Sequence, residues 1–240
     1  MGKLILILLL LFRSFTLTPG GIAGGTVEGY DRDRYMDLME RRDERGPVSL
    51  DEQVRVLKEL GITLSDETLK STQEIWSEES FGYEYWLPLL YEGWGSYDYK
   101  TGTWTPSSSQ VYSFDAEFYD VEGMYQLYLQ GLQSISQGEL MFSDVSADYS
   151  KVDYDSRDGT VEVKFTLNGQ KCTFLARYMG DWLDLMIRDA VNGALEELGV
   201  EKRFYATDGG QGEIIFFCTE EWARAFEEAT LCYMSDTAKY

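Results

Sequence analysis

The chain has 240 residues, 44% hydrophobic and 26% charged, so it is long enough to bury a core and is neither a disordered nor a fibrous sequence. Its 42 Asp and Glu residues against 21 Lys and Arg residues give a formal net charge of −21, which argues against anionic nucleic acid as a partner. Histidine is absent, so catalytic triads and general bases that need imidazole are excluded, as are zinc sites that contain histidine.

The first 25 residues are predicted to be a hydrophobic leader followed by a Gly-rich linker. Lys3 precedes an apolar run, Leu4 to Phe12, and GGIAGG follows at 20–25. A cleaved signal peptide, an uncleaved membrane anchor and a buried or interfacial segment are all open interpretations. Arg13 suits neither of the first two, and the apolar stretch is shorter than the ~20 residues of a spanning helix. We expect a membrane-anchored or secreted protein that contacts the membrane through this segment only. A cytoplasmic location also stays open.

Helix-start and helix-stop signals predict three helices, over 31–45, 49–60 and 65–78. Ser49 and Glu52 form a capping box, in which the serine hydroxyl accepts a hydrogen bond from a free backbone N–H and the glutamate reaches back. Ser65 caps the third helix, with acidic residues in the first turn where the helix dipole favours them.

From position 111 onwards, segments with strand periodicity alternate with helical ones. Asn168 and Gly169 supply the two residues of a type I′ turn, the clearest hairpin signal in the chain. Counting back from this turn pairs Phe165 with Cys172, which makes Cys172 a packing residue. Further strands are predicted over 111–119, 140–149, 203–207 and 213–218, and further helices over 121–137, over 181–198 and after the capping residue Thr219.

These elements predict an α+β protein in three parts. Residues 1–25 are the leader and linker, residues 26–110 a small helical, aromatic-rich subdomain, and residues 111–240 an α+β domain. In the last part we expect two layers, a mostly antiparallel sheet covered by helices.

Cys172, Cys218 and Cys232 are an odd number of cysteines without CxxC spacing, so the sequence contains no zinc or haem motif. Cys172 and Cys218 fall at apolar-face positions of predicted strands, where a small buried hydrophobic residue is the main interpretation. A disulfide between them is the other. No cofactor and no metal are predicted.

Two short motifs are better explained as turns than as ligand sites. DGGQG at 208–212 has the glycines of a phosphate-binding loop, but Asp208 and Glu213 flank it and no basic residue follows. Residues 153–159 invite comparison with a calcium loop, but Arg157 stands where an oxygen ligand belongs. Among 42 acidic residues no spacing selects a catalytic carboxylate pair, so no catalytic residue is predicted.

Negative charge and aromatic residues are concentrated in the same part of the chain. Residues 59–150 contain two basic residues against 16 acidic ones, and residues 81–119 contain 13 of the 35 aromatic residues. A core helix explains some of the aromatic residues in this segment. Tyr and Trp in the loop at 95–109, however, are typical of binding surfaces, because they provide rigid amphipathic contacts. The candidate binding surface consists of Glu92, Trp94, Tyr97, Asp98, Tyr99 and Trp104.

We expect a non-enzymatic acidic binding domain, anchored or exported, that engages a basic protein partner through electrostatic steering. One alternative is an exported carbohydrate- or cell-wall-binding module in which the loop aromatics stack on a polysaccharide. Another is an immunity-type inhibitor of a basic toxin, a class that the chain resembles in charge and fold class alone.

Overall fold

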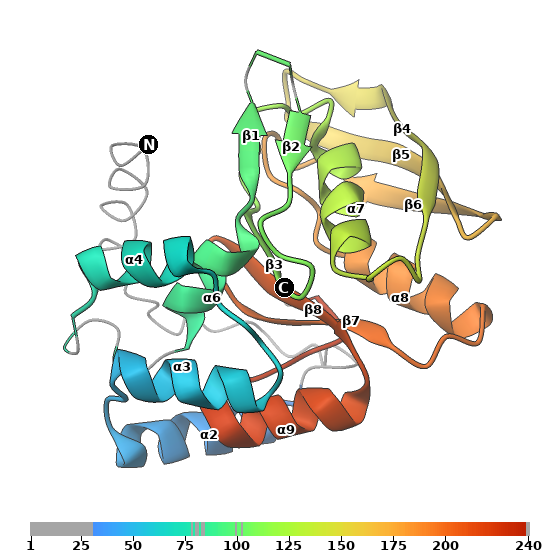
Figure 1. Cartoon of the computed structure of the whole chain (residues 1–240). Coiled ribbons are helices and arrows are strands. Elements are labelled where there is room, and N and C mark those ends of the chain that lie inside the picture. The colour runs from blue at the N-terminus through green and yellow to red at the C-terminus, as the bar shows by residue number, and fades with distance from the viewer. Residues whose placement is uncertain are drawn as a thin grey trace. The chain divides into compact units, whose positions relative to one another are not determined.

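The computed structural model describes residues 31–77, 79, 82, 85–98, 100–101 and 103–238 (Figure 1). Residues Asp31–Tyr240 form one compact unit. The predicted leader and linker over 1–25 lie outside the described residues. None of the helices in the described ranges is both long enough and apolar enough to span a membrane.

The N-terminal helices begin where the capping signals predict. In α2 (Arg32–Arg45), the Arg34 N–H donates to Asp31 at 3.0 Å. In α3 (Leu50–Glu59), the Glu52 N–H donates to the Ser49 hydroxyl at 3.3 Å. Ser65 caps α4 (Asp66–Ile75), which ends earlier than predicted because Trp76 has extended backbone angles. Helix α6 (Trp86–Gly93) is apolar and largely buried.

The strands form three antiparallel sheets, so the predicted α+β class with antiparallel pairing is confirmed, but the strands do not form a single sheet. The strands are β1 (Ser96–Asp98), β2 (Thr103–Thr105), β3 (Tyr112–Asp115), β4 (Phe142–Asp153), β5 (Asp158–Leu167), β6 (Gln170–Arg177), β7 (Arg203–Asp208) and β8 (Gly212–Cys218). Their orders are β1-β2, β3-β8-β7 and β4-β5-β6. The predicted register of the β5–β6 hairpin is confirmed: Phe165 faces Cys172, and both Asn168 and Gly169 have positive φ.

The remaining helices are α7 (Met124–Ser134), α8 (Ile187–Glu197) and α9 (Glu220–Thr230). Helix α7 packs on β4, and α8 contacts β6 and β7 (Figure 1). Helix α9 begins at its predicted cap, Thr219, which accepts a hydrogen bond from the Trp222 N–H. Helix α8 therefore contacts strands of two different sheets. Helix α9 contacts the N-terminal helices, where the Trp222 indole N–H donates to the Leu60 carbonyl at the end of α3.

Two apolar cores lie on opposite faces of the β3-β8-β7 sheet. Along β8, Ile215 belongs to one core, and its neighbours Ile214 and Phe216 belong to the other. A strand that is buried on both faces has a continuous apolar sequence, as in IIFFC at 214–218. The second core contains Leu57 and Leu89 together with residues of β8 and α9, so the predicted ranges 26–110 and 111–240 share it.

Two predicted elements are shorter in the structure, and hydrogen bonds fix the non-regular backbone next to each of them. The strand predicted over 111–119 ends at Asp115, whose carboxylate accepts a hydrogen bond from the Glu117 N–H at 2.9 Å. The helix predicted from Asp181 begins at Ile187. Residues before it form a loop in which the Leu183 N–H donates to the Ala116 carbonyl at 2.8 Å.

Candidate binding surfaces

The hairpin β1–β2 carries most of the predicted surface. Tyr97 faces Trp104 across the two strands. Trp104 is half-buried: its indole N–H donates to the Trp94 carbonyl at 3.2 Å, and its ring lies edge-on to buried Tyr112 at 5.5 Å. The Trp104 ring also packs closely on Gly95, which has φ 70°: a Cβ on Gly95 would lie only 2.5 Å from the indole nitrogen of Trp104. Trp104 therefore attaches the hairpin to the core.

The structure places the other predicted surface residues in different environments. Trp94 is 36% exposed and Asp98 is exposed, whereas Tyr97 is half-buried. Tyr99 lies outside the described residues. Glu92 is only 4% exposed, because its carboxylate accepts a hydrogen bond from the Ser65 N–H at the start of α4. Glu92 is thus a buried residue that joins α6 to α4, and its assignment to an exposed surface is wrong.

A second surface, which the sequence did not single out, is built on the loop between β3 and α7. Its Tyr119 is 98% exposed, the largest exposure among the exposed large hydrophobic residues of the described chain. Glu117, Asp120 and Glu122 flank Tyr119 and are also exposed. We call these four residues together with Tyr154 and Tyr178 the tyrosine–acid surface.

Backbone hydrogen bonds hold the loop in place. The Phe118 N–H donates to the Asp181 carbonyl at 2.7 Å, and Glu117 forms a β-bridge with Trp182. At its other end, Asp120 accepts a hydrogen bond from the Gly123 N–H at 3.1 Å. The exposed side chains therefore project from an anchored backbone.

Tyr149 connects the loop to the tyrosines of the neighbouring sheet. Its hydroxyl donates to the Val121 carbonyl at 2.6 Å. Burial, together with nearby Tyr154 and Glu122, raises the pKa of Tyr149 to about 12. The ring of Tyr154, 63% exposed, meets that of Tyr178 edge-on at 5.7 Å. Aromatic and acidic groups from segments distant in sequence thus meet at one surface.

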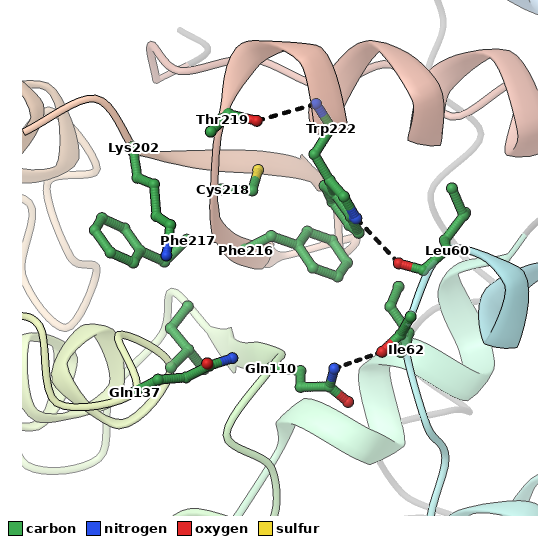
Figure 2. A pocket seen from close by; sticks show the side chains of 12 residues that line it. Leu60, Ile62, Gln110, Gln137, Lys202, Phe216, Phe217, Cys218, Thr219 and Trp222 are labelled. Carbon is green, nitrogen blue, oxygen red and sulfur yellow. Dashed lines mark hydrogen bonds between the residues drawn. The ribbon is translucent and has the colours of Figure 1, made fainter.

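A pocket lies between the end of α3, the end of β8 and the start of α9 (Figure 2). Its volume is about 240 Å³. Its apolar walls are Leu60, Ile62, Ile135, Phe216, Phe217 and Trp222. Two hydrogen bonds fix the wall on the α3 side: the Trp222 indole N–H donates to the Leu60 carbonyl at 3.0 Å, and the Gln110 amide donates to the Gly61 carbonyl at 2.6 Å.

Polar groups also reach this pocket. Gln137 and Lys202 lie on one side, and the rings of Phe216 and Trp222 on the other (Figure 2). The Lys202 ammonium lies 5.4 Å from the centroid of the Phe217 ring and forms an ion pair with exposed Glu139. The pocket therefore has a polar end and an aromatic end.

No protein family model matches the chain, and no curated protein or solved structure is significantly similar to it. The function is therefore inferred from the residues and geometry of the molecule itself.

Cys218, the cysteine that lines the pocket, is not an activated thiolate. All three cysteines lie within the described residues and are free thiols, so the alternative of a Cys172–Cys218 disulfide is not present. Burial raises the pKa of Cys218, which lines the pocket, to about 12. Among the residues that the structure describes, no group of three or more Cys, Asp and Glu side chains is arranged to hold a metal ion.

Proposed function

We propose that this protein is an acidic binding domain that engages a basic protein partner through the tyrosine–acid surface. The observation that carries the proposal is the nearly complete exposure of Tyr119 between Glu117, Asp120 and Glu122. These residues belong to a stretch, 101–150, that contains no Lys or Arg. The net charge of −21 adds a long-range attraction for a basic partner.

Charge and aromatic residues contribute to different steps of such an association. Exposed carboxylates accelerate the encounter with a basic partner, but each screened surface pair adds little to the final affinity. Tyrosine supplies a large, rigid and amphipathic contact whose desolvation slows dissociation. Tyr119 and Tyr154 are therefore the expected anchors, and Asp120 and Glu122 the expected steering groups.

The backbone of the surface is ordered before binding. Two hydrogen bonds, from the Phe118 N–H to the Asp181 carbonyl and from the Tyr149 hydroxyl to the Val121 carbonyl, connect the loop to two other segments. A surface whose backbone is fixed in advance loses less conformational entropy when the partner binds. Binding without catalysis is part of the proposal, since the chain has no histidine and burial raises the pKa of Cys218 to about 12.

Selection of peptides from a random displayed library on the full-length protein tests this proposal. We expect enrichment of peptides that combine Arg or Lys with an apolar residue. Tyr119→Ala should weaken binding of the selected peptides by about tenfold or more, equivalent to ~1.4 kcal/mol. The charge variant Asp120→Asn/Glu122→Gln should weaken it at low salt.

The matched control is Glu40→Gln/Glu44→Gln, which removes two exposed carboxylates from α2 instead. Its peptide affinity should stay within about twofold of the wild type. Equal losses in the control and in the surface variants would show that only the overall charge matters. Selection of peptides without basic residues would also contradict the proposal.

A further inference from the structure

The lining of the pocket in Figure 2 differs in charged residues from the chain as a whole. Twelve residues line it, all of them described, and Lys202 is the only one of them with a charged side chain. No carboxylate is among the lining residues, although acidic residues outnumber basic ones two to one in the sequence. Glu139, which forms an ion pair with Lys202, is itself exposed.

The two ends of the pocket differ in chemistry. The Phe216 and Trp222 rings, 5.3 Å apart between centroids, form the aromatic end with Ile62 beside them (Figure 2). The Lys202 ammonium and the Gln137 amide form the polar end. Ligand sites combine apolar walls with a few polar groups that fix the ligand's orientation. This pocket likewise combines apolar walls with a few polar groups.

The volume of the pocket suits a small ring system. A closed apolar cavity of about 150 Å³ holds one benzene ring. The volume here is about 240 Å³, which leaves room for one or two fused rings and a small substituent.

We propose that this pocket is a binding site for a small aromatic carboxylate. The ligand ring packs against the wall that Ile62, Phe216 and Trp222 form together, and the carboxylate meets the Lys202 ammonium. The site is independent of the tyrosine–acid surface, so each proposal stands or falls on its own test.

Lys202 can turn toward a ligand at small cost. Its present partner, Glu139, lies at the surface with 47% of its side chain exposed, and exposed ion pairs contribute little to stability. The contact of the ammonium with the Phe217 ring keeps it next to the pocket. A ligand carboxylate that is partly shielded by aromatic walls offers a stronger partner than a solvated glutamate does.

The test uses three probes that share one ring system and differ in charge: indole-3-acetate, indole-3-acetamide and tryptamine. Each is titrated into full-length protein while the Trp222 indole N–H and the Gln110 and Gln137 side-chain amides are followed by NMR. We expect these signals to shift, with the carboxylate binding about tenfold more tightly than the amide and the amine binding most weakly. The chain's net negative charge works against this order, so observing it requires a local cation.

Lys202→Met keeps the aliphatic stem but removes the charge, and Lys171→Met on exposed β6 is the matched control. In Lys202→Met the affinity for the carboxylate should fall to that for the amide, which itself stays unchanged; Lys171→Met should bind all three probes as the wild type does. The proposal is overturned if no probe shifts the Trp222 signal, if tryptamine binds best, or if Lys202→Met leaves the preference for the carboxylate intact.

Discussion

Arg188 on α8 and Glu213 on β8 form a buried ion pair with two hydrogen bonds, Nε to Oε2 at 3.1 Å and Nη2 to Oε1 at 2.8 Å. Arg188 is 1% exposed. Its remaining N–H groups donate to the carbonyls of Phe204, Ser235 and Thr237, so all five guanidinium donors have acceptors. Burial acts to lower the pKa of Arg188, but Glu213 raises it on balance. The pair joins the C-terminal segment to the central sheet.

Removing one partner of this pair should be strongly destabilising. Arg188→Met leaves the Glu213 carboxylate buried without its counter-ion, and it removes the donors to the Ser235 and Thr237 carbonyls. We expect the free energy of unfolding to fall by about 3–5 kcal/mol. Urea denaturation followed by circular dichroism measures this loss. In the double variant Arg188→Met/Glu213→Leu part of the loss should be recovered; a double variant less stable than Arg188→Met would contradict the ion-pair explanation.

The pH dependence of stability should differ in sign between Asp115 and Asp148. Burial raises the pKa of Asp115 above 3.8, so the folded state binds more protons than the unfolded state does just above pH 3.8. The stability contributed by the protonated form is lost as the pH rises through the raised pKa. Asp115→Asn should therefore increase the free energy of unfolding at pH 7 and have little effect at pH 3.

Asp148 is the comparison residue, with a pKa lowered by the backbone hydrogen bond from Ser150. Its contribution to stability is present above pH 3.8 and is lost as the pH falls through the lowered pKa. Asp148→Asn removes the same charge but should decrease stability at pH 7. Denaturant titrations of both variants at pH 3, 5 and 7 test this. The same direction of change at pH 7 in both variants would mean that the overall charge outweighs the local environment.

Two helical glycines should respond in opposite ways to substitution by alanine. A Cβ on Gly131 in α7 would lie 2.1 Å from the buried ring of Tyr112, whereas Gly193 in α8 has nothing within 4 Å. Gly131→Ala should cost about 1–3 kcal/mol through overpacking. Gly193→Ala should stabilise the protein by about 0.5–1 kcal/mol, since alanine restricts the unfolded chain. Thermal unfolding of both variants checks the pair, and a stabilised Gly131→Ala would show that α7 is less tightly packed than in the structure.

Alanine substitutions of Trp104 and Trp94 should have different effects on stability, because Trp104 packs on the core and Trp94 is partly exposed. Trp104 packs on Tyr112 and donates to the Trp94 carbonyl, so Trp104→Ala should lower the free energy of unfolding by about 2–4 kcal/mol. The Trp94 side chain is partly exposed, and Trp94→Ala should cost less than about 1 kcal/mol. Chemical denaturation compares the two. A smaller loss for Trp104→Ala than for Trp94→Ala would contradict the anchoring role of Trp104.

Local signals in the sequence were sufficient for much of the fold. Ser49, Ser65 and Thr219 cap helices as predicted, because N-capping depends on residues within one turn. The Asn168-Gly169 turn sets the β5–β6 register, because the turn type fixes which residues face each other. The division of the strands into three sheets depends on contacts between segments that are distant in sequence, so no local sequence pattern predicts this division.

A hydrophobic pattern alone does not identify the buried face of α8. The apolar residues Met186 and Leu198 at the two ends of this helix are exposed, whereas Arg188 and Asn192 within it are buried. Both polar residues donate hydrogen bonds to carbonyls of β7 and of the C-terminal segment. A hydrophobic pattern cannot predict such hydrogen bonds. For the loop of the tyrosine–acid surface, the sequence does contain a local signal. Asp115 accepts a hydrogen bond from the backbone N–H two residues later, and Asp120 from the one three residues later. Aspartate in such positions is typical of turns, so these two residues indicate a loop where a strand and a helix start were predicted.

The most direct test of the proposed function is the association kinetics of a selected basic peptide, measured by stopped-flow fluorescence at about 20 mM and about 500 mM salt, where the Debye length falls from about 20 Å to about 4 Å. We expect the association rate constant to fall by about tenfold or more across this range. We also expect slower association for Asp120→Asn/Glu122→Gln and faster dissociation for Tyr119→Ala. An association rate constant that is independent of salt, or a Tyr119→Ala dissociation rate equal to that of the wild type, would contradict binding at the tyrosine–acid surface.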